Sequence, residues 1–449
     1  MTDTPTFIFD HWELLPQVGK ILFHYVLRHQ EEEFRFTDTL VLPAAFDKET
    51  IPQELLEKLL NNCLLMLGIS YWKLYCPKDI QIASFSLSKE QADFWNKVYT
   101  KGLGEFFYEN QIDYRELINF PFDTAKIDEA VTVFPRQNRT LLPVGGGKDS
   151  IVAAELLKKA EKPFTVLTLY SGVSRSPAQK AVAQEIGEQT LVVKRLIDPQ
   201  LFELNKRSDI YNGHVPAVAM HSWVSIFLAA LYDYTYVIFS NEESASYGNV
   251  EFYGEIVNHQ WSKSLEFEKM LQKYLNTFVT QDIVYFSLLR PFSEIKITQL
   301  FSEYPRYLAS FVSCNKGYRI ATEGNTGWCG ECPKCAFVFV MIAAFLPKEK
   351  VLSVFGKNLF DDESLVSLYK ELLGLEAFKP FECVGTPEEV RLALFKAWER
   401  GEWKESIIMK LFIADVLPRM QNNKEQEEHL FTLQEKSMPQ EFEEVVREV

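Results

Sequence analysis

The residues with the clearest chemical potential form one loop: Gly145, Gly146, Gly147, Lys148, Asp149 and Ser150. Consecutive glycines let backbone N–H groups converge on an anion, because no side chain blocks their approach. Lys148 adds a positive charge, Ser150 a hydrogen bond and Asp149 an oxygen ligand for Mg²⁺. These residue types predict a phosphate-binding loop. A plain glycine turn capped by Asp or Ser is the structural alternative.

The elements around this loop must place it at an open edge. An apolar run precedes it and an amphipathic pattern follows it, so we expect a strand, the loop and then a helix whose free N–H groups favour an anion. Further strands are expected at 164–170, 190–193 and 236–239, and helices at 176–186 and 217–231. This alternation predicts an α/β fold with a doubly wound parallel sheet. Ligands bind at the carboxyl ends of such strands.

Two polar clusters supply further candidates. The first follows the strand expected at 236–239, where active-site loops occur, and the second precedes a helical pattern. A helix-capping region rich in Ser and Glu is the alternative for the first cluster. The candidates are Asn241, Glu242, Glu243 and Ser244 in the first cluster and Asn258, His259, Gln260, Ser262 and Lys263 in the second.

A few of these groups are candidates for proton transfer, and a positioning or packing role is the alternative for each histidine. His214, which follows Asn212, and His259 titrate near neutrality, and a desolvated Lys263 can act as a base. Glu242 or Glu243 is expected to act as a base or to hold a second metal ion. Arg290, at the end of an apolar run, pairs with a carboxylate or holds a substrate phosphate or carboxylate.

Four of the seven cysteines form the pattern C-x14-C-x2-C-x2-C, namely Cys314, Cys329, Cys332 and Cys335. Gly and Pro between them favour tight turns that bring thiolates onto one ion. The spacing predicts a structural Zn²⁺ site that leaves no open coordination position. An iron–sulfur cluster uses similar spacing, and four free thiols are the remaining alternative.

Length and composition set wider limits. A chain of 449 residues is long enough for two or three domains, and we divide it into an N-terminal α+β region (1–135), a catalytic region (136–347) and a helical region (348–449). We find no catalytic constellation in 1–135 and assign no chemistry to the tail that begins at residue 421. The tail from residue 421 is strongly acidic, and we expect a solvated helix or partial disorder there.

Charge and hydropathy indicate the compartment and the partners. A net charge of −15 disfavours general nucleic-acid binding. The longest apolar run, 336–346, is too short to span a bilayer, and no signal-peptide pattern is visible, so we expect a cytoplasmic protein without a membrane partner. The oligomeric state is not predicted by these features.

The glycine loop matches neither the Walker A spacing nor the GxGxxG fingerprint. It resembles the PP-loop of N-type ATP pyrophosphatases, although Gly145 stands where that family usually has Ser. The resemblance implies that ATP binds with its pyrophosphate in the loop, that Mg²⁺ binds Asp149, and that Leu169 and Tyr170 line the adenine pocket. In such enzymes an acceptor oxygen attacks the α-phosphorus and pyrophosphate leaves.

A closer resemblance is carried by five segments: 212–225, 240–249, 258–264, 285–294 and 328–339. They resemble the bacterial UDP-N-acetyl-α-D-muramoyl-L-alanyl-L-glutamate epimerases. This resemblance implies that ATP and Mg²⁺ drive conversion of the terminal L-Glu of UDP-MurNAc-L-Ala-L-Glu to D-Glu through an acyl-adenylate, in peptidoglycan precursor synthesis. The residues then expected to contact substrate are Asn212, Asn241, Ser244, Asn258, Gln260, Ser262 and Arg290.

Other outcomes of adenylation stay open from the sequence. A PP-loop ligase, amidotransferase or thiolase would act on another small carboxylate or amide. The chain shows neither a nucleophilic Cys directly after Met1, as a glutaminase would have, nor a rhodanese module. A non-catalytic ATP-binding module would release no pyrophosphate.

Overall fold

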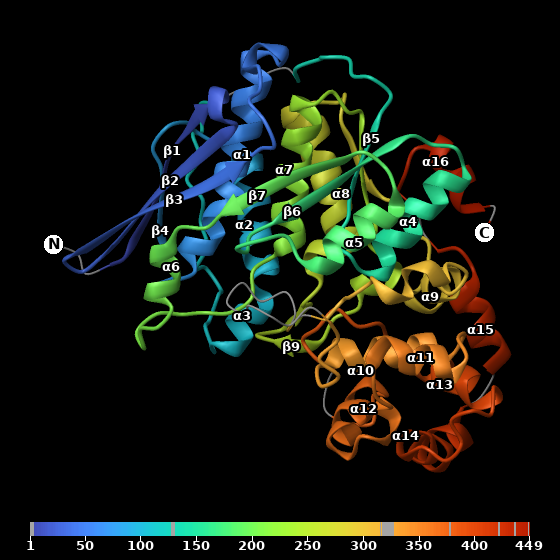
Figure 1. Ribbon diagram of the computed structural model, residues 1–449. Coiled ribbons are helices and arrows are strands. Elements are labelled where there is room, and N and C mark those ends of the chain that lie inside the picture. Colours follow the sequence, from blue (N-terminus) through green and yellow to red (C-terminus); the bar gives the residue numbers. More distant parts are fainter. Residues whose placement is uncertain are drawn as a thin grey trace.

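The computed structural model describes residues 4–126, 131–314, 316, 327–376, 379–420, 423–434, 437–447 and 449. Its centre is a nine-stranded sheet with the order β11-β8-β5-β6-β7-β3-β2-β1-β4 (Figure 1). The strands are β1 (Thr6–Leu15), β2 (Lys20–His29), β3 (Glu32–Val41), β4 (Asp79–Ile82), β5 (Thr140–Pro143), β6 (Phe164–Tyr170), β7 (Thr190–Leu196), β8 (Tyr236–Phe239) and β11 (Val284–Ser287). A separate hairpin pairs β9 (Val250–Phe252) with β10 (Glu255–Val257).

The parallel part of the sheet contains the reversal that marks a ligand site. The strands β7, β6, β5, β8 and β11 are parallel neighbours in that order. The chain therefore builds outward from β5 in one direction and then, from β8, in the other. In open α/β sheets ligands bind beyond the strand ends at such a reversal. The predicted α/β class with a mostly parallel sheet is confirmed.

Helices cover both faces because successive side chains of a central strand point to opposite sides. Leu141 of β5 belongs to one hydrophobic core, whereas Leu142 belongs to the other, and neither is exposed. On the first face lie α1 (Gln53–Trp72), α2 (Lys89–Gly102), α3 (Gly104–Glu109), α7 (Ala217–Leu231) and α8 (Leu265–Tyr274). On the second lie α4 (Lys148–Lys159), α5 (Pro177–Ile186) and α9 (Glu294–Phe301).

The N-terminal region shares this sheet instead of forming its own. Strand β3 pairs with β7 in antiparallel register, with Leu40 opposite Arg195. The guanidinium of Arg195 donates to both carboxylate oxygens of Asp38 on β3, and Asp38 is fully buried. Residue 135, where the sequence suggested a boundary, therefore separates neither two sheets nor two hydrophobic cores.

The C-terminal helices extend the core on the α4 face. They are α10 (Pro333–Ala343), α11 (Lys348–Phe355), α12 (Val366–Leu372), α13 (Pro387–Glu399), α14 (Ile407–Leu411), α15 (Asn423–Phe431) and α16 (Gln440–Arg447). In Figure 1 the helices α10 to α15 gather beneath the sheet, whereas α16 returns beside α4.

The acidic tail is better anchored than its charge suggests. Phe442, Val445 and Val446 of α16 are buried, and Glu441 accepts hydrogen bonds from Tyr236 of β8 and Lys162. The expectation of a solvated or partly disordered tail is wrong for this segment. Its apolar residues recur at helical spacing, so they form one face that packs on the core.

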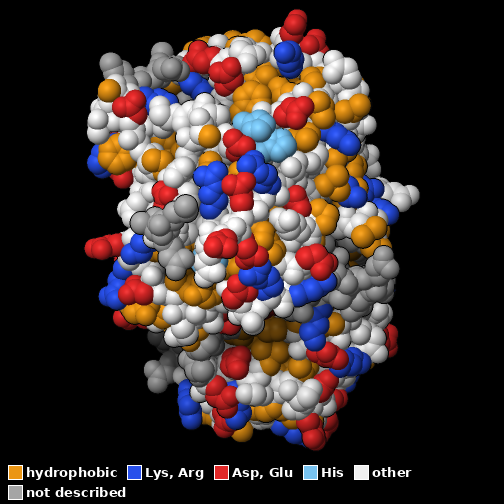
Figure 2. Space-filling view, turned by 90° about the vertical axis from the view of Figure 1, so that its left-hand side faces the viewer, with side chains coloured by type: hydrophobic (Ala, Val, Ile, Leu, Met, Phe, Trp, Pro, Cys, Tyr) orange, Lys and Arg blue, Asp and Glu red, His pale blue; other side chains and the backbone are white. Residues whose placement is uncertain are grey.

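The surface carries no single dominant charge on the face that Figure 2 shows. There, Lys and Arg side chains are interspersed with Asp and Glu, on the side of the molecule where β1 to β4 lie in Figure 1. In the described part of the chain, no helix combines the length and the apolar composition that crossing a membrane requires.

Candidate active site

The glycine loop leaves β5 at Pro143 and enters α4 at Lys148. Gly146 has φ +95°, a conformation that glycine adopts without strain. A Cβ at Gly147 would lie 2.8 Å from Ser313 Oγ, and the Val312 N–H donates to Gly146 O at 3.0 Å. At Gly145 an added Cβ would meet no atom within 4 Å, so the loop is open on that side. The segment before the cysteine cluster thus holds the back of the loop.

A pocket lies in front of this loop at the reversal between β5 and β8. Its walls come from the ends of β5, β6 and β8 and from α7, as the carboxyl-end rule requires. Leu169 lines this pocket, whereas the ring of Tyr170 lies 5.7 Å from Lys194 Nζ. The polar groups that line the pocket are Asp149, Ser150, Gln179, His221, Ser225, Ser240, Asn241 and Lys263.

Three carboxylates converge beside the loop. One oxygen from each of Asp149, Glu242 and Glu294 lies within 4.8 Å of the others. Glu242 and Glu294 are each 1% exposed, and among the described residues neither oxygen of Glu242 has a hydrogen-bond partner. Buried carboxylates without partners are costly unless a cation binds them. The donor set therefore fits a hard divalent cation such as Mg²⁺.

This cluster distinguishes between the two glutamates that the sequence left open. Glu242 belongs to it, whereas the partly buried Glu243 does not. Glu294, the first residue of α9, was missed by sequence reasoning. Its only local signal was its position shortly after Arg290, in the segment that follows β11, the strand next to β8.

Lysines surround the three carboxylates. Lys148 is buried and forms ion pairs with both Asp149 and Glu294, so it holds the cluster together. Burial opposes ionisation of Asp149, but Lys148 and the nearby Lys334 and Lys263 outweigh it and hold its pKa below the ordinary value. Burial, reinforced by Asp149, raises the pKa of Glu294 to about 7. Lys263 has a raised pKa despite its burial, because acidic groups surround it.

The two predicted histidines meet on one carboxylate. His214 Nδ1 lies 3.3 Å from Glu105 Oε2, His259 Nδ1 contacts the same oxygen, and the ring centroids are 4.8 Å apart. Burial lowers the pKa of His214 well below its ordinary value, and the neighbouring His259 lowers it further. The pKa of His259 rises to about 10, because its contacts with Cys383 and Glu105 outweigh its burial. The two shifts have opposite directions: they favour the protonated form of His259 and the neutral form of His214.

Glu105 comes from α3, within the region in which we found no catalytic constellation. The structure nevertheless brings a carboxylate from this region to the candidate site: α3 packs against β10 and places Glu105 next to the second polar cluster. No motif in the sequence marks Glu105, because α3 has the sequence of an ordinary helix rich in aromatic residues.

Arg290 has an internal position. It is 1% exposed, and its guanidinium donates to Glu268, also 1% exposed, through Nε at 3.2 Å and Nη2 at 2.9 Å. It also donates to the backbone carbonyls of Glu242 and Lys263, each at 2.5 Å. Arg290 thus fixes the two polar segments relative to each other, and these contacts are those of a positioning residue.

The other residues predicted to bind substrate mostly form hydrogen bonds within the protein, which hold the two polar clusters in place. Asn241 donates to Ser287 Oγ at 3.0 Å, Ser244 to Glu389 at 2.7 Å, and Asn258 to the Ala245 carbonyl at 2.8 Å. Other contacts join Asn212 to Lys73 at 3.4 Å and Gln260 to the Val384 carbonyl at 3.2 Å, while Ser262 is buried. Of this set, Asn241 also lines the pocket.

The four cysteines predicted to bind metal come together. Their Sγ atoms all lie within 4.8 Å of one another, at 3.9 Å for Cys314–Cys332, 3.6 Å for Cys329–Cys335 and 3.5 Å for Cys332–Cys335. Sulfur atoms about 2.3 Å from one Zn²⁺ form a tetrahedron with edges of about 3.8 Å. The observed separations fit one such ion and leave no space for a cluster of several iron atoms between the sulfurs.

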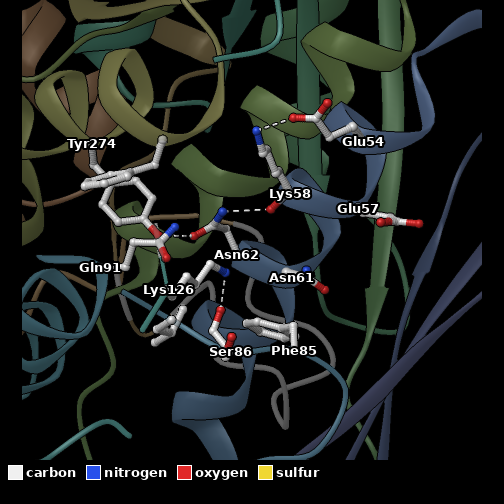
Figure 3. Close-up of a pocket in the computed structure, with 12 residues that line it drawn as sticks. Glu54, Glu57, Lys58, Asn61, Asn62, Phe85, Ser86, Gln91, Lys126 and Tyr274 are labelled. Atoms are coloured by element: carbon white, nitrogen blue, oxygen red, sulfur yellow. Dashed lines mark hydrogen bonds and ion pairs between the residues drawn. The ribbon is translucent and has the colours of Figure 1, made fainter. Parts of the chain in front are cut away.

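A separate pocket lies between α1, α2 and the end of α8, away from the glycine loop (Figure 3). Its polar groups bind mainly one another: Tyr274 donates to Asn62 at 2.9 Å, Asn62 to the Lys58 carbonyl at 2.7 Å, and Lys126 to the Ser86 carbonyl at 2.5 Å. This satisfied network distinguishes it from the site at the loop, where Glu242 has no such partner.

Sequence comparisons with known proteins cover almost the whole chain. The profile of the MurL N-terminal domain matches residues 1–288, and that of the MurL C-terminal domain matches residues 310–428. A relative from Xanthomonas oryzae pv. oryzae is 38% identical over 96% of this chain and 94% of its own length. Relatives from a Micromonospora strain and from Salinispora tropica are 35% and 33% identical, each over 92% of this chain and over 91% and 89% of their own lengths. All three are named UDP-N-acetyl-alpha-D-muramoyl-L-alanyl-L-glutamate epimerase.

Proposed function

Because this chain belongs to the MurL family, we propose that it converts the terminal L-Glu of UDP-MurNAc-L-Ala-L-Glu to D-Glu, in a reaction that uses ATP and Mg²⁺ and passes through an acyl-adenylate. The names of three relatives that cover almost the whole chain support the substrate and the stereochemical change. The observation that carries the ATP-dependent mechanism is the glycine loop with three converging carboxylates at the sheet reversal. In this proposal the enzyme supplies D-Glu for peptidoglycan precursor synthesis.

In adenylation, the glycine loop binds the nucleotide and the three carboxylates bind the metal ion. Backbone groups of Gly145 to Gly147 and the start of α4 hold the pyrophosphate portion of ATP. Asp149, Glu242 and Glu294 hold Mg²⁺, which when bound neutralises charge that develops on the transferred phosphate. Lys148 keeps Asp149 and Glu294 in place, and Ser150 lines the same pocket. The glutamate α-carboxylate attacks the α-phosphorus, and pyrophosphate leaves.

Adenylation makes the later proton transfer possible. The α-proton beside a carboxylate is weakly acidic, because its loss would create a second negative charge next to the one on the carboxylate. The acyl-adenylate is neutral at that carbonyl, so the carbanion is stabilised as an enolate. Removal of the α-proton on one face and its return on the other inverts the centre. Water then hydrolyses the acyl-adenylate, so AMP leaves and the carboxylate is restored. Lys263 adjoins the carboxylate cluster, and His259 lies in the adjacent polar segment, which makes them the best placed of the predicted acid–base groups.

The four cysteines are proposed to hold a structural Zn²⁺. Their separations fit a tetrahedral ion, and two backbone N–H groups, from Gly330 and Glu331, donate to Cys335 and Cys329 sulfurs, each at 3.4 Å. Such donors stabilise thiolates around a metal. The ion would secure the segment that reaches Val312 and Ser313, which support the glycine loop from behind.

Coupling between nucleotide and product tests this function. The protein is incubated with Mg²⁺, ATP and UDP-MurNAc-L-Ala-L-Glu, and pyrophosphate release and substrate mass are followed. We expect pyrophosphate and AMP release that requires the peptide substrate, with no change in substrate mass. A ligase, amidotransferase or thiolase would change that mass. Asp149→Asn should abolish AMP formation, and full activity of that variant would overturn the assignment of the loop.

A further inference from the structure

A segment from the C-terminal region reaches into the site. Lys334 donates to the backbone carbonyl of Cys383, and Gln260 donates to that of Val384 at 3.2 Å. Asn249, in the loop between the two polar clusters, donates to the carbonyls of Lys379 and Pro380 at 3.1 and 2.8 Å. These contacts fix the segment 379–384 at both ends. The C-terminal region, in which we identified no site residue from the sequence, therefore places a cysteine beside the predicted acid–base groups.

The thiol of Cys383 completes a row of polar groups. Its side chain forms a hydrogen bond with the His259 imidazole, and His259 in turn contacts Glu105. Lys263 lines the same pocket as Asp149, and its positive charge lowers the pKa of the Cys383 thiol. The row thus runs from the carboxylate cluster through Lys263 and Cys383 to His259 and Glu105.

A second observation points to a ligand at the same place. Gln260 is 2% exposed, and while its Nε2 is bound to Val384, its Oε1 has no hydrogen-bond partner among the residues that the structure describes. A buried acceptor without a partner is unfavourable unless a ligand donates to it. A peptide substrate carries N–H groups that suit such an acceptor.

We propose that Cys383 is a catalytic residue that exchanges the α-proton of the glutamyl residue, and that His259 and Glu105 position and charge-balance its thiolate. The proposal rests on the proposed function, because it needs the acyl-adenylate as its substrate. It assigns one of the two groups that an inversion of configuration requires, on a segment distant in sequence from every motif that marks the nucleotide site.

The proposed exchange uses two groups and causes no net gain or loss of protons or electrons. The Cys383 thiolate takes the α-proton, so a Cα–H bond breaks and an S–H bond forms, while the electron pair moves to the acyl carbonyl oxygen as an enolate. The Lys263 ammonium donates a proton to Cα on the opposite face, and the enolate pair returns to form the new Cα–H bond. The thiol then returns its proton to the Lys263 amine through solvent. No oxidant or reductant is needed.

The charges around the thiol favour this role. Burial raises the pKa of Cys383, but Lys263 and the hydrogen bond from His259 outweigh it and lower the pKa to about 6. The titratable groups that act on this pair are Lys263, Lys334, Lys379, Glu105 and Glu382. A thiolate at neutral pH with a pKa near the working pH suits general base catalysis.

The first test separates adenylation from proton transfer. Wild type, Cys383→Ser, Cys383→Ala and the control Cys63→Ala, which alters a buried thiol of α1, are assayed in D₂O with ATP, Mg²⁺ and UDP-MurNAc-L-Ala-L-Glu. We expect both Cys383 variants to release pyrophosphate but to lose α-deuterium incorporation by about 100- to 10,000-fold, the usual contribution of a general acid–base group. The control should keep both activities.

Three results would count against Cys383 or against the reaction itself. Wild-type deuterium incorporation by Cys383→Ser would overturn the proposal, as would loss of pyrophosphate release in both folded Cys383 variants, which would place Cys383 in adenylation. Absence of both signals in the wild type would instead refute the proposed function.

A second test needs no substrate and so does not depend on the proposed function. The rate at which iodoacetamide alkylates Cys383 in the intact protein is measured by peptide mass spectrometry as pH rises. We expect a half-maximal rate near pH 6 in wild type, and a shift to higher pH in His259→Asn because the imidazolium is lost. A midpoint at the ordinary thiol value in wild type would remove the thiolate on which the proposal depends.

Discussion

Glu242→Gln should stabilise the metal-free protein while removing its response to Mg²⁺. Glu242 is buried, neither of its oxygens has a partner among the described residues, and oxygens of Asp149 and Glu294 lie within 4.8 Å. Two unit charges at that separation repel by about 3.5 kcal/mol at an effective dielectric constant of about 20. The amide keeps the shape of the side chain and removes its charge.

The expected gain in the free energy of unfolding is smaller than the sum of the repulsions of Glu242 by Asp149 and by Glu294. Lys263 attracts Glu242, which offsets about one of them, and Glu294, with a pKa of about 7, is partly protonated near neutrality. We therefore expect the free energy of unfolding in EDTA to rise by about 1–3 kcal/mol. In wild type, Mg²⁺ at 100 times its dissociation constant should add about 2.7 kcal/mol, and this increment should vanish in Glu242→Gln.

Urea unfolding in EDTA and in Mg²⁺ measures both effects. Glu243→Gln is the matched control, because it removes the same charge one residue away from the cluster and should leave the Mg²⁺ increment intact. If Glu242→Gln instead destabilised the metal-free protein and kept the Mg²⁺ increment, the three carboxylates would not form a cation site.

Three further predictions concern the framework of the site. Asp38→Ala leaves Arg195 buried without its partner, so urea unfolding should show a loss of about 3–5 kcal/mol; a loss below about 1 kcal/mol would refute a role for this pair in joining β3 to β7. Cys332→Ser should reduce zinc measured by mass spectrometry from one equivalent to almost none, and unchanged metal content would contradict the tetrahedral site. Protonated His259 should stabilise the fold: since its folded pKa of about 10 lies above the ordinary 6.5, that stabilisation is complete below pH 6.5 and is lost as pH rises through about 10. The stability difference between wild type and His259→Asn should shrink across that range, and a constant difference would show that His259 is not charged.

The secondary structure could be predicted where local signals are strong. The helix expected at 217–231 coincides with α7, and the helix expected at 176–186 coincides with α5, which starts with a Ser176 capping box and a proline. The glycine loop and the cysteine spacing were also visible, because their residues are close together in the sequence.

The rest of the site depends on contacts between distant segments. Glu105, Glu294 and Cys383 lie in α3, α9 and the segment before α13, and no local pattern distinguishes them from ordinary residues. Arg290 had two possible roles from its sequence position, pairing with a carboxylate or holding a substrate anion, and only the fold shows that it is buried against Glu268. The continuity of the sheet through β3 and β7 was missed for the same reason, since strand pairing across more than a hundred residues leaves no local sequence signal.

Chiral analysis of glutamate tests the central claim most directly. UDP-MurNAc-L-Ala-L-Glu is incubated with the protein and Mg²⁺, with and without ATP, and the product is hydrolysed and its glutamate enantiomers are separated. We expect D-Glu in an amount that depends on ATP, with alanine remaining L. Glutamate that stays entirely L while pyrophosphate is released, or D-Glu that forms equally without ATP, would contradict it.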